Sequence, residues 1–175
     1  GVGVALELST AVVHLENWTC AALDGEVVSE LEATVRGGCL LLQSSGLPDA
    51  RIELLSSHFT GVRSRADFQR PTVTGMAVLV YRTYAGAFSA VIVRDSTFTN
   101  CTTISASRLT NVGALALLDV VDASVTNCHF ARNVVNGAAA SLLYWRFNWA
   151  RLTSGLLKVQ HCTFSRNEAA FGSFA

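Results

Sequence analysis

Three stretches of the chain carry the same pattern, and this pattern decides the fold. They are Val93-Arg94-Asp95-Ser96-Thr97-Phe98-Thr99-Asn100-Cys101, Val125-Thr126-Asn127-Cys128-His129-Phe130-Ala131-Arg132-Asn133 and Val159-Gln160-His161-Cys162-Thr163-Phe164-Ser165-Arg166-Asn167. The shared pattern is V-x-x-[CS]-x-F-x-x-[NC], and less complete copies surround Phe59 and Cys20. The anchor residue recurs at Cys20, Phe59, Phe98, Phe130 and Phe164, at intervals of 39, 39, 32 and 34 residues. Periods of this size are typical of solenoids, propellers and repeat arrays.

Within each copy, apolar and polar residues alternate, as they do in a strand whose successive side chains face opposite sides of a sheet. Cys128 and Phe130 fall on one side and His129 on the other, whereas a helix would need apolar residues at i, i+3, i+4 and i+7. A second element, a Gly followed by small and aliphatic residues, lies between the copies, for example from Gly75 to Val80. We therefore expect two or three short strands per repeat, each stacked on its counterpart in the next repeat.

Stacking of this kind arranges equivalent residues in columns about 4.8 Å apart. One interior column contains Trp18, Ser57, Ser96, Cys128 and Cys162. The next interior column contains the anchors Cys20, Phe59, Phe98, Phe130 and Phe164. Between them an outward, polar column contains Thr19, His58, Thr97, His129 and Thr163. Asn133 and Asn167 end their copies, and stacked amides of this type can form a hydrogen-bonded ladder at a corner.

These residues also resemble a known family. Phe130-Ala131-Arg132-Asn133 followed by Gly137-Ala138-Ala139-Ala140, and Phe164-Ser165-Arg166-Asn167 followed by Gly172-Ser173-Phe174-Ala175, are similar to the Phe-x-x-Asn and Gly-Gly-Ala-Ile repeats of polymorphic outer-membrane proteins. Those repeats belong with the pectin-lyase-like superfamily. The resemblance implies an all-β, right-handed parallel β-helix (solenoid) of about five coils of 32–39 residues. It further implies an extended surface stalk, often adhesive. We expect residues 1–175 to form one β-helix domain that is a piece of a longer solenoid.

Composition excludes several classes of protein. The chain has 175 residues, 50% of them hydrophobic and 15% charged, with a net charge of zero. Typical soluble domains have about 25% charged residues, so this chain has unusually few. Disordered segments have the opposite bias, with high charge and low hydrophobicity, and are therefore excluded. A nucleic-acid-binding protein is expected to have an excess of Lys and Arg, so the balanced charge argues against a nucleic-acid partner. Residues 75–93 include one charged residue, Arg82, within a turn-like centre. We interpret them as two strands and expect no membrane span.

The cysteines and two sequons bear on the cellular compartment. Cys128 and Cys162 occupy equivalent positions one coil apart, a separation compatible with a disulfide. The alternative, which we favour, is an interior stack of free thiols. Asn17-Trp18-Thr19 and Asn100-Cys101-Thr102 are N-glycosylation sequons. Asn17 is predicted to face outward and Asn100 to lie near a corner, so both could carry a glycan.

Two places are candidates for ligand contact. Tyr144, Trp145, Arg146 and Trp149 lie in an aromatic segment that is either a binding loop or a further strand. Arg132 and Arg166 stack one coil apart and could bind an anion or a glycan carboxylate, although solvated surface is the simpler interpretation. A further candidate contact loop runs from Arg63 to Thr74.

We find no residues suited to catalysis. Enzymes of pectin-lyase-like fold would place carboxylates in adjacent coils on one face, and Asp95, Asp119 and Asp122 form no such pair in the predicted columns. His58 and His129 are two coils, about 9–10 Å, apart and cannot share a metal. We expect no catalytic residues, no metal and no cofactor.

The leading hypothesis is a noncatalytic structural or adhesive β-helix module of a cell-surface or extracellular assembly. The alternatives are a polysaccharide-active enzyme, a lyase or hydrolase, on the same fold, and an intracellular scaffold subunit of a large assembly. Solenoids need caps over their open edges. We expect neighbouring coils or protein subunits to cover both open ends, and glycans are possible ligands.

Overall fold

The structure is a computed structural model, and it describes residues 4–8, 12–21, 24–27, 36–37, 39–44, 51–66, 73–82, 88–105, 111–135, 141–145 and 155–169. These residues contain 21 strands and no helix. The described part of the chain is therefore all-β. It is arranged as four sheets in which every strand pairing is parallel.

Each sheet is defined here by its strands. Sheet A contains β1 (Val4–Leu8), β6 (Leu40–Ser44), β10 (Val73–Arg82), β14 (Asn111–Leu118) and β18 (Leu142–Trp145) in that order, with β5 (Arg36–Gly37) beside β10. Sheet B contains β2 (Val12–Glu16), β7 (Arg51–Leu55), β11 (Phe88–Arg94), β15 (Val120–Thr126) and β19 (Leu156–Gln160). Sheet C contains β3 (Thr19–Ala21), β8 (His58–Thr60), β12 (Thr97–Thr99), β16 (His129–Ala131) and β20 (Thr163–Ser165). Sheet D contains β4 (Asp24–Val27), β9 (Arg63–Ala66), β13 (Thr102–Ser105), β17 (Val134–Val135) and β21 (Glu168–Ala169).

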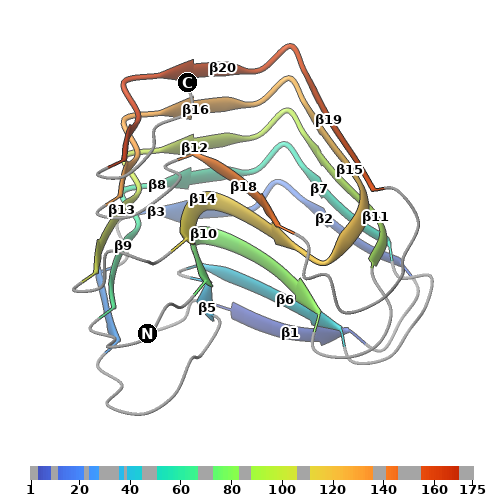
Figure 1. Ribbon diagram of the computed structural model, residues 1–175, viewed down its shortest axis with the longest axis horizontal. Helices are drawn as coiled ribbons and strands as arrows, with labels where there is room; N and C mark the ends of the chain where they lie inside the picture. The colour runs from blue at the N-terminus through green and yellow to red at the C-terminus, as the bar shows by residue number, and fades with distance from the viewer. Residues whose placement is uncertain are drawn as a thin grey trace.

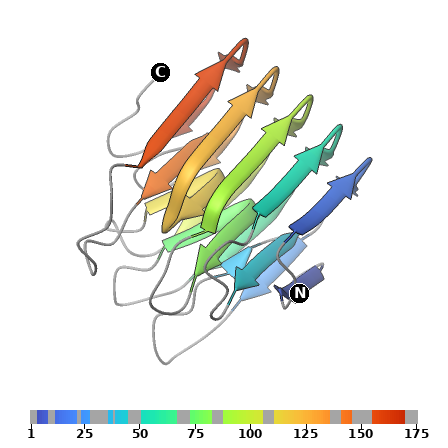
Figure 2. The same ribbon diagram turned by 90° about the vertical axis from the view of Figure 1, so that its right-hand side faces the viewer.

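The described strands follow sheets A, B, C and D in turn, five times over. We call these repeats passes; β1–β4 form the first and β18–β21 the fifth. Figure 1 shows β2, β7, β11, β15 and β19 side by side in sequence order, with β3 to β20 continuing from them around a bend. Figure 2 shows the same colour order, blue to red, across the stack. Each pass has one strand in each of the four sheets, and the second pass has β5 in addition, where the sequence led us to expect two or three strands.

The register reproduces the columns predicted from the repeat. Cys20 pairs with Phe59, Phe59 with Phe98, Phe98 with Phe130 and Phe130 with Phe164. The phenylalanine rings stack with centroid separations of 5.1, 4.9 and 4.9 Å along the column. Phe59, Phe98 and Phe130 are fully buried. Each ring thus packs against its equivalent in the next pass.

Single residues in the left-handed conformation make the corners. Between sheets B and C these are Asn17, Ser56, Asp95, Asn127 and His161, with φ from 48° to 58°. Between sheets C and D they are Gly61, Asn100, Arg132 and Arg166, with φ from 54° to 67°. Asn and Asp tolerate this region better than most residues. Because the sheet B–C corner recurs at the same place in all five passes, sheets B and C meet at a constant bend (Figure 1).

The core lies between the sheets and is built from alternate strand residues. Leu40, Leu42, Leu115 and Leu117 enter it from sheet A, and Ile52, Leu54, Val91, Val93 and Val125 enter it from sheet B. Backbones approach each other closely at Gly113, where an added Cβ would lie 2.8 Å from the Leu115 carbonyl oxygen and 2.9 Å from the Leu143 nitrogen. Gly113 pairs with Gly75, next to a register shift in β10. Glycine is required at 113 because the backbones approach so closely.

Two further expectations concern residues 75–93. Residues 75–82 lie in β10 and residues 88–93 lie in β11, so two strands are found there as predicted, but Arg82 ends β10 rather than lying in a turn. No helix among the described residues is long and apolar enough to cross a membrane. The Gly elements at 137–140 and 172–175 lie outside the described residues.

Candidate functional site

The outward face of sheet C is a polar surface of short side chains. Thr19, His58, Thr97, His129 and Thr163 form one column in register. A hydrogen bond of 3.0 Å joins His58 Nδ1 to Thr97 Oγ1, and another joins His129 Nδ1 to Thr163 Oγ1. In the second column, Thr99 Oγ1 donates to Thr60 Oγ1 at 3.1 Å. The polar groups of this face therefore connect adjacent passes.

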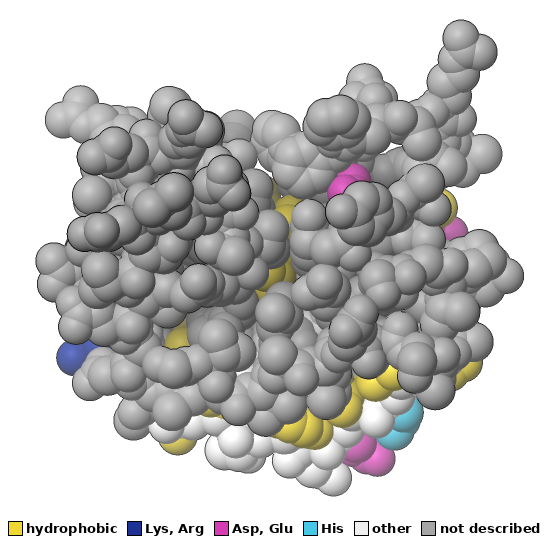
Figure 3. Space-filling view, turned by 90° about the horizontal axis from the view of Figure 1, so that it is seen from below, with side chains coloured by type: hydrophobic (Ala, Val, Ile, Leu, Met, Phe, Trp, Pro, Cys, Tyr) yellow, Lys and Arg dark blue, Asp and Glu magenta, His cyan; other side chains and the backbone are white. Residues whose placement is uncertain are grey.

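A charged network lies on the outward face of sheet B in the first two passes. His14 Nδ1 lies 3.0 Å from Glu53 Oε2, and Arg51 Nη2 lies 2.6 Å from Glu53 Oε1. The hydrogen bond to Glu53, with help from Glu16, raises the pKa of His14, and the same bond to His14 lowers the pKa of Glu53. The network is solvent-exposed and joins β2 to β7. Figure 3 shows acidic and histidine side chains side by side among the described residues on one face.

The candidate carboxylates do not share a column. Asp95 occupies a corner, where it accepts a 2.5 Å hydrogen bond from Asn127 Nδ2 and lies 3.2 Å from Arg94 Nε. Asp119 is a left-handed turn residue between β14 and β15. Asp122 lies in β15 and pairs with Ala90 and Leu156. The Asp95 carboxylate is thus bound by the side chains of Asn127 and Arg94.

Arg132 and Arg166 occupy the same corner in successive passes. Both are exposed, with φ of 54°. Each immediately precedes an Asn of the corner ladder, and Arg132 N donates to Ser165 O at 2.9 Å. The structure therefore places the two arginines in one outward row, as the repeat predicted.

The aromatic segment is described only at its start. Tyr144 lies in β18 and is half-buried against the core, with its hydroxyl 2.9 Å from Val120 O and 3.1 Å from Val121 O. The backbone of Trp145 ends β18, whereas Arg146 and Trp149 lie outside the described residues. Tyr144 and Trp145 therefore lie in a strand, which is the second of the two interpretations of this segment, and not in a binding loop. Within the 63–74 loop, Arg63–Ala66 form β9, so that loop was predicted too long.

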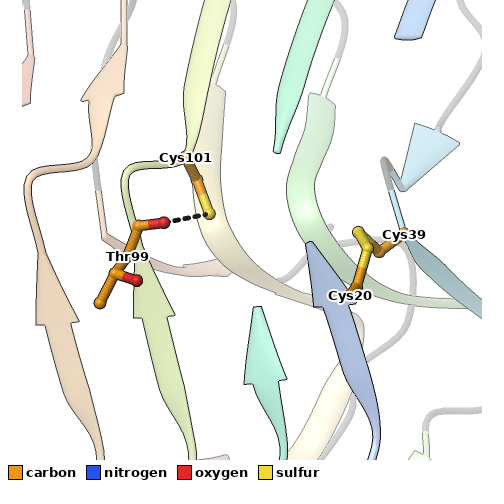
Figure 4. Close-up of a disulfide and its surroundings, with 4 residues drawn as sticks. All are labelled: Cys20, Cys39, Thr99 and Cys101. Atoms are coloured by element: carbon orange, nitrogen blue, oxygen red, sulfur yellow. Dashed lines mark hydrogen bonds between the residues drawn. A yellow bond between two sulfur atoms is a disulfide. The ribbon is translucent and has the colours of Figure 1, made fainter. Parts of the chain in front are cut away.

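The disulfide differs from the one considered from the sequence. Cys20 of β3 is bonded to Cys39, just before β6, with a Cα–Cα distance of 6.3 Å (Figure 4). Cys128 and Cys162 are free thiols, which is the interpretation that the sequence favoured, and the alternative disulfide between them is not formed. In parallel strands paired in register, equivalent side chains point the same way, so their sulfurs do not face each other. Each thiol instead lies 3.3 Å from a carbonyl oxygen two residues earlier.

The free thiols are held within the stack. Burial raises the pKa of Cys101 to about 12 and that of Cys128 to about 11. Cys101 Sγ lies 3.6 Å from Thr99 O (Figure 4). The thiolate is the reactive form of cysteine, so these two residues act as small apolar groups.

Both sequon asparagines lie at exposed corners. Asn17 and Asn100 have φ of 58° and 54°. Asn17 lies at the sheet B–C corner of the first pass, and Asn100 lies at the sheet C–D corner of the third. Both side chains are accessible to solvent.

Metal binding and similarity to other proteins give no further indication of function. Within the described ranges, no group of three or more His, Cys, Asp or Glu residues could hold a metal ion. No protein-family model, curated protein or solved structure matches the chain.

Proposed function

We propose that the chain is a right-handed parallel β-helix and serves as a noncatalytic structural or adhesive module of a cell-surface or extracellular assembly. One observation carries this proposal: the repeated residues of the motif are used to hold one pass to the next. The phenylalanines stack on one another. The asparagines and serines bond to the backbone of the preceding pass.

The asparagine ladder gives the Phe-x-x-Asn motif a physical role. Asn133 Nδ2 donates to Phe98 O at 3.0 Å, and Asn167 Nδ2 donates to Phe130 O at 3.0 Å. Asn133 Oδ1 accepts from Cys101 N at 3.0 Å. Each Asn therefore satisfies buried backbone groups of the pass before it, as buried polar groups require. This use of the motif supports the resemblance to polymorphic outer-membrane protein repeats.

Two features support an extracellular location. Disulfides such as Cys20–Cys39 persist mainly in oxidising compartments. The sequon residues Asn17 and Asn100 are exposed at corners, where a bulky glycan can be accommodated. A surface of Thr, Ser and His side chains is compatible with an extended stalk.

Peptide mass spectrometry of native protein, without reduction, tests this location. We expect a Cys20–Cys39 cross-linked peptide and hexose-containing glycan on Asn17 or Asn100. Recombinant Thr19→Ala and Thr102→Ala variants, each of which removes one sequon and keeps its Asn, are the matched controls. Free thiols at both Cys20 and Cys39 in native material would contradict an extracellular location.

The second candidate, an intracellular scaffold subunit, is favoured by the three free thiols Cys101, Cys128 and Cys162. The same experiment decides between the two. Reduced Cys20 and Cys39 together with unmodified Asn17 and Asn100 would favour the scaffold.

A further inference from the structure

The sheet C–D corner is occupied by two different kinds of residue along the stack. In the second and third passes it holds Gly61 and Asn100, whereas in the fourth and fifth it holds Arg132 and Arg166, and all four have positive φ. Glycine and asparagine adopt this left-handed conformation readily, but in arginine it brings Cβ too close to the following carbonyl oxygen. The asparagine of the third pass therefore suits the corner better than either arginine does.

The two arginines also lie close to each other. The rings of Phe130 and Phe164, each two residues before its arginine, are 4.9 Å apart. Arg132 N donates to the carbonyl oxygen of Ser165, the residue before Arg166, at 2.9 Å. The two corners are therefore in register, and two positive charges lie side by side on neighbouring passes. Like charges that face each other across paired strands are unfavourable.

No opposite charge offsets this repulsion within the described ranges of the chain. Neither Arg132 nor Arg166 forms an ion pair there. Arg132 is exposed although the passes on both sides of it are described, so its exposure is on the side of the stack and not at an end. Strained backbone and unmatched local charge are the kinds of conflict that proteins retain at functional sites.

The chemistry of the two guanidinium groups indicates which anion suits them. A guanidinium group binds oxyanions through paired N–H donors. The two oxygens of a carboxylate are both occupied by one arginine that binds in this paired fashion. A sulfate ester has three free oxygens, so it accepts hydrogen bonds from two neighbouring guanidinium groups at once. The pair at the corner therefore favours a sulfate ester over a carboxylate.

The surface beside the two arginines is neutral and carries hydroxyl groups. The outward columns of sheet C contain Thr97, Thr99, Thr163 and Ser165, and hydroxyl groups both donate and accept hydrogen bonds. Two cations on a chain of zero net charge are few for a nucleic acid, whose binding rests on many phosphate contacts. They are also few for an anionic membrane, which is bound by clusters of roughly 4–8 Lys and Arg. A sugar polymer fits this surface best.

We propose that Arg132 and Arg166, which we call the arginine row, bind the sulfate esters of a sulfated polysaccharide. One sulfate group lies between the two guanidinium groups, and the sugar hydroxyls lie against the outward face of sheet C. This inference rests on the proposed adhesive function and names its ligand. The row is on the side of the stack, where further passes at either end would leave it uncovered.

Calorimetric titration of the 175-residue chain with heparin oligosaccharides tests this proposal. We expect saturable binding that weakens as the salt concentration rises. The same oligosaccharides with their sulfate groups removed and their amino groups acetylated keep their carboxylates, and they should bind about tenfold more weakly or worse. No binding of heparin, or equal binding of the two forms, would overturn the proposal. Tighter binding of a DNA duplex or of a phosphoserine peptide would also overturn it.

An Arg132→Asn, Arg166→Asn double variant locates the site. Because Asn100 holds the same corner in the third pass, we expect an unchanged or higher Tm together with heparin binding weakened about tenfold or more. An Arg51→Gln, Arg94→Gln double variant, the control, removes the same charge from sheet B and should bind heparin as the wild type does. Equal losses of binding in the two variants would assign it to net charge. A lower Tm in the Asn variant would show that the arginines serve the fold. Either result would overturn the proposal.

This test is separate from that of the proposed function. A linked Cys20–Cys39 peptide with glycan, together with no heparin binding, would leave the extracellular structural role in place and remove the arginine row as a binding site. Sulfate-dependent binding that requires the row, together with free Cys20 and Cys39, would do the reverse.

Discussion

Phe98 is the residue whose loss should most disturb the ring stack. It is fully buried and stacks on Phe59 at 5.1 Å and on Phe130 at 4.9 Å. We expect Phe98→Ala to lower the free energy of unfolding by about 3–5 kcal/mol, measured by urea denaturation. Phe164→Ala, the matched control, should cost less because its ring is partly exposed and has one ring neighbour. Equal costs for the two variants would contradict the stack.

Asn133 supports the buried corner between sheets C and D. Its side chain bonds to Cys101 N, Phe98 O and Asn167 Oδ1, and it is fully buried. Asn133→Ala leaves Cys101 N without its side-chain acceptor and removes the hydrogen bond that Asn133 donates to Phe98 O, so we expect a loss of about 1–3 kcal/mol. Asn167→Ala should cost less in the same denaturation experiment, because the Asn167 side chain is only half-buried. A larger loss for Asn167→Ala would be inconsistent with the ladder.

At the scale of elements, the His14–Glu53 pair makes the contact between β2 and β7 sensitive to pH. The pKa of His14 is raised above its ordinary value of 6.5, so its contribution is present below that value and lost as pH rises through the folded pKa. The pKa of Glu53 is lowered from its ordinary value of 4.5, so its contribution is present above that value and lost as pH falls through the folded pKa. The pair therefore stabilises most between pH 4.5 and 6.5.

An NMR titration of His14 checks this interaction. We expect Glu53→Gln to lower the pKa of His14, because the hydrogen bond to Glu53 is the main cause of its rise. Glu16→Gln, the control, should lower it less. An unchanged His14 pKa in Glu53→Gln would show that the pair does not form.

The sequence predicted the sheet B–C half of each pass well and the remainder poorly. The motif includes a large residue, Phe, at regular spacing, and this fixed the columns that run through Phe59 and His58. Strands β17 and β21 have two residues each, too few to leave an alternating pattern. The Cys20–Cys39 bond joins β3 of sheet C to the residue just before β6 of sheet A, two positions that are not equivalent in the repeat. The left-handed corner at Arg132 was also beyond reach, because Arg has no intrinsic preference for that conformation.

For the whole molecule, the disulfide ties the first pass to the second. It connects residues 19 apart in sequence. Loop closure of that length corresponds to about 3 kcal/mol of stabilisation. We expect a Cys20→Ser, Cys39→Ser double variant to lose about that amount in urea denaturation without reductant. Reduced wild-type protein, the control, should match the variant. A variant as stable as the oxidised wild type would show that the bond does not constrain the chain.

The central claim is that successive passes lie parallel and in register, and amide NMR on the folded chain tests it most directly. We expect cross-strand contacts that link His58 to Thr97, Thr97 to His129 and His129 to Thr163, with hydrogen bonds such as Thr97 N to Ser57 O. Parallel strands lack the close Hα–Hα pairs of antiparallel ones. Strong Hα–Hα contacts between neighbouring segments such as β7 and β8 would show hairpins and contradict the stacked passes.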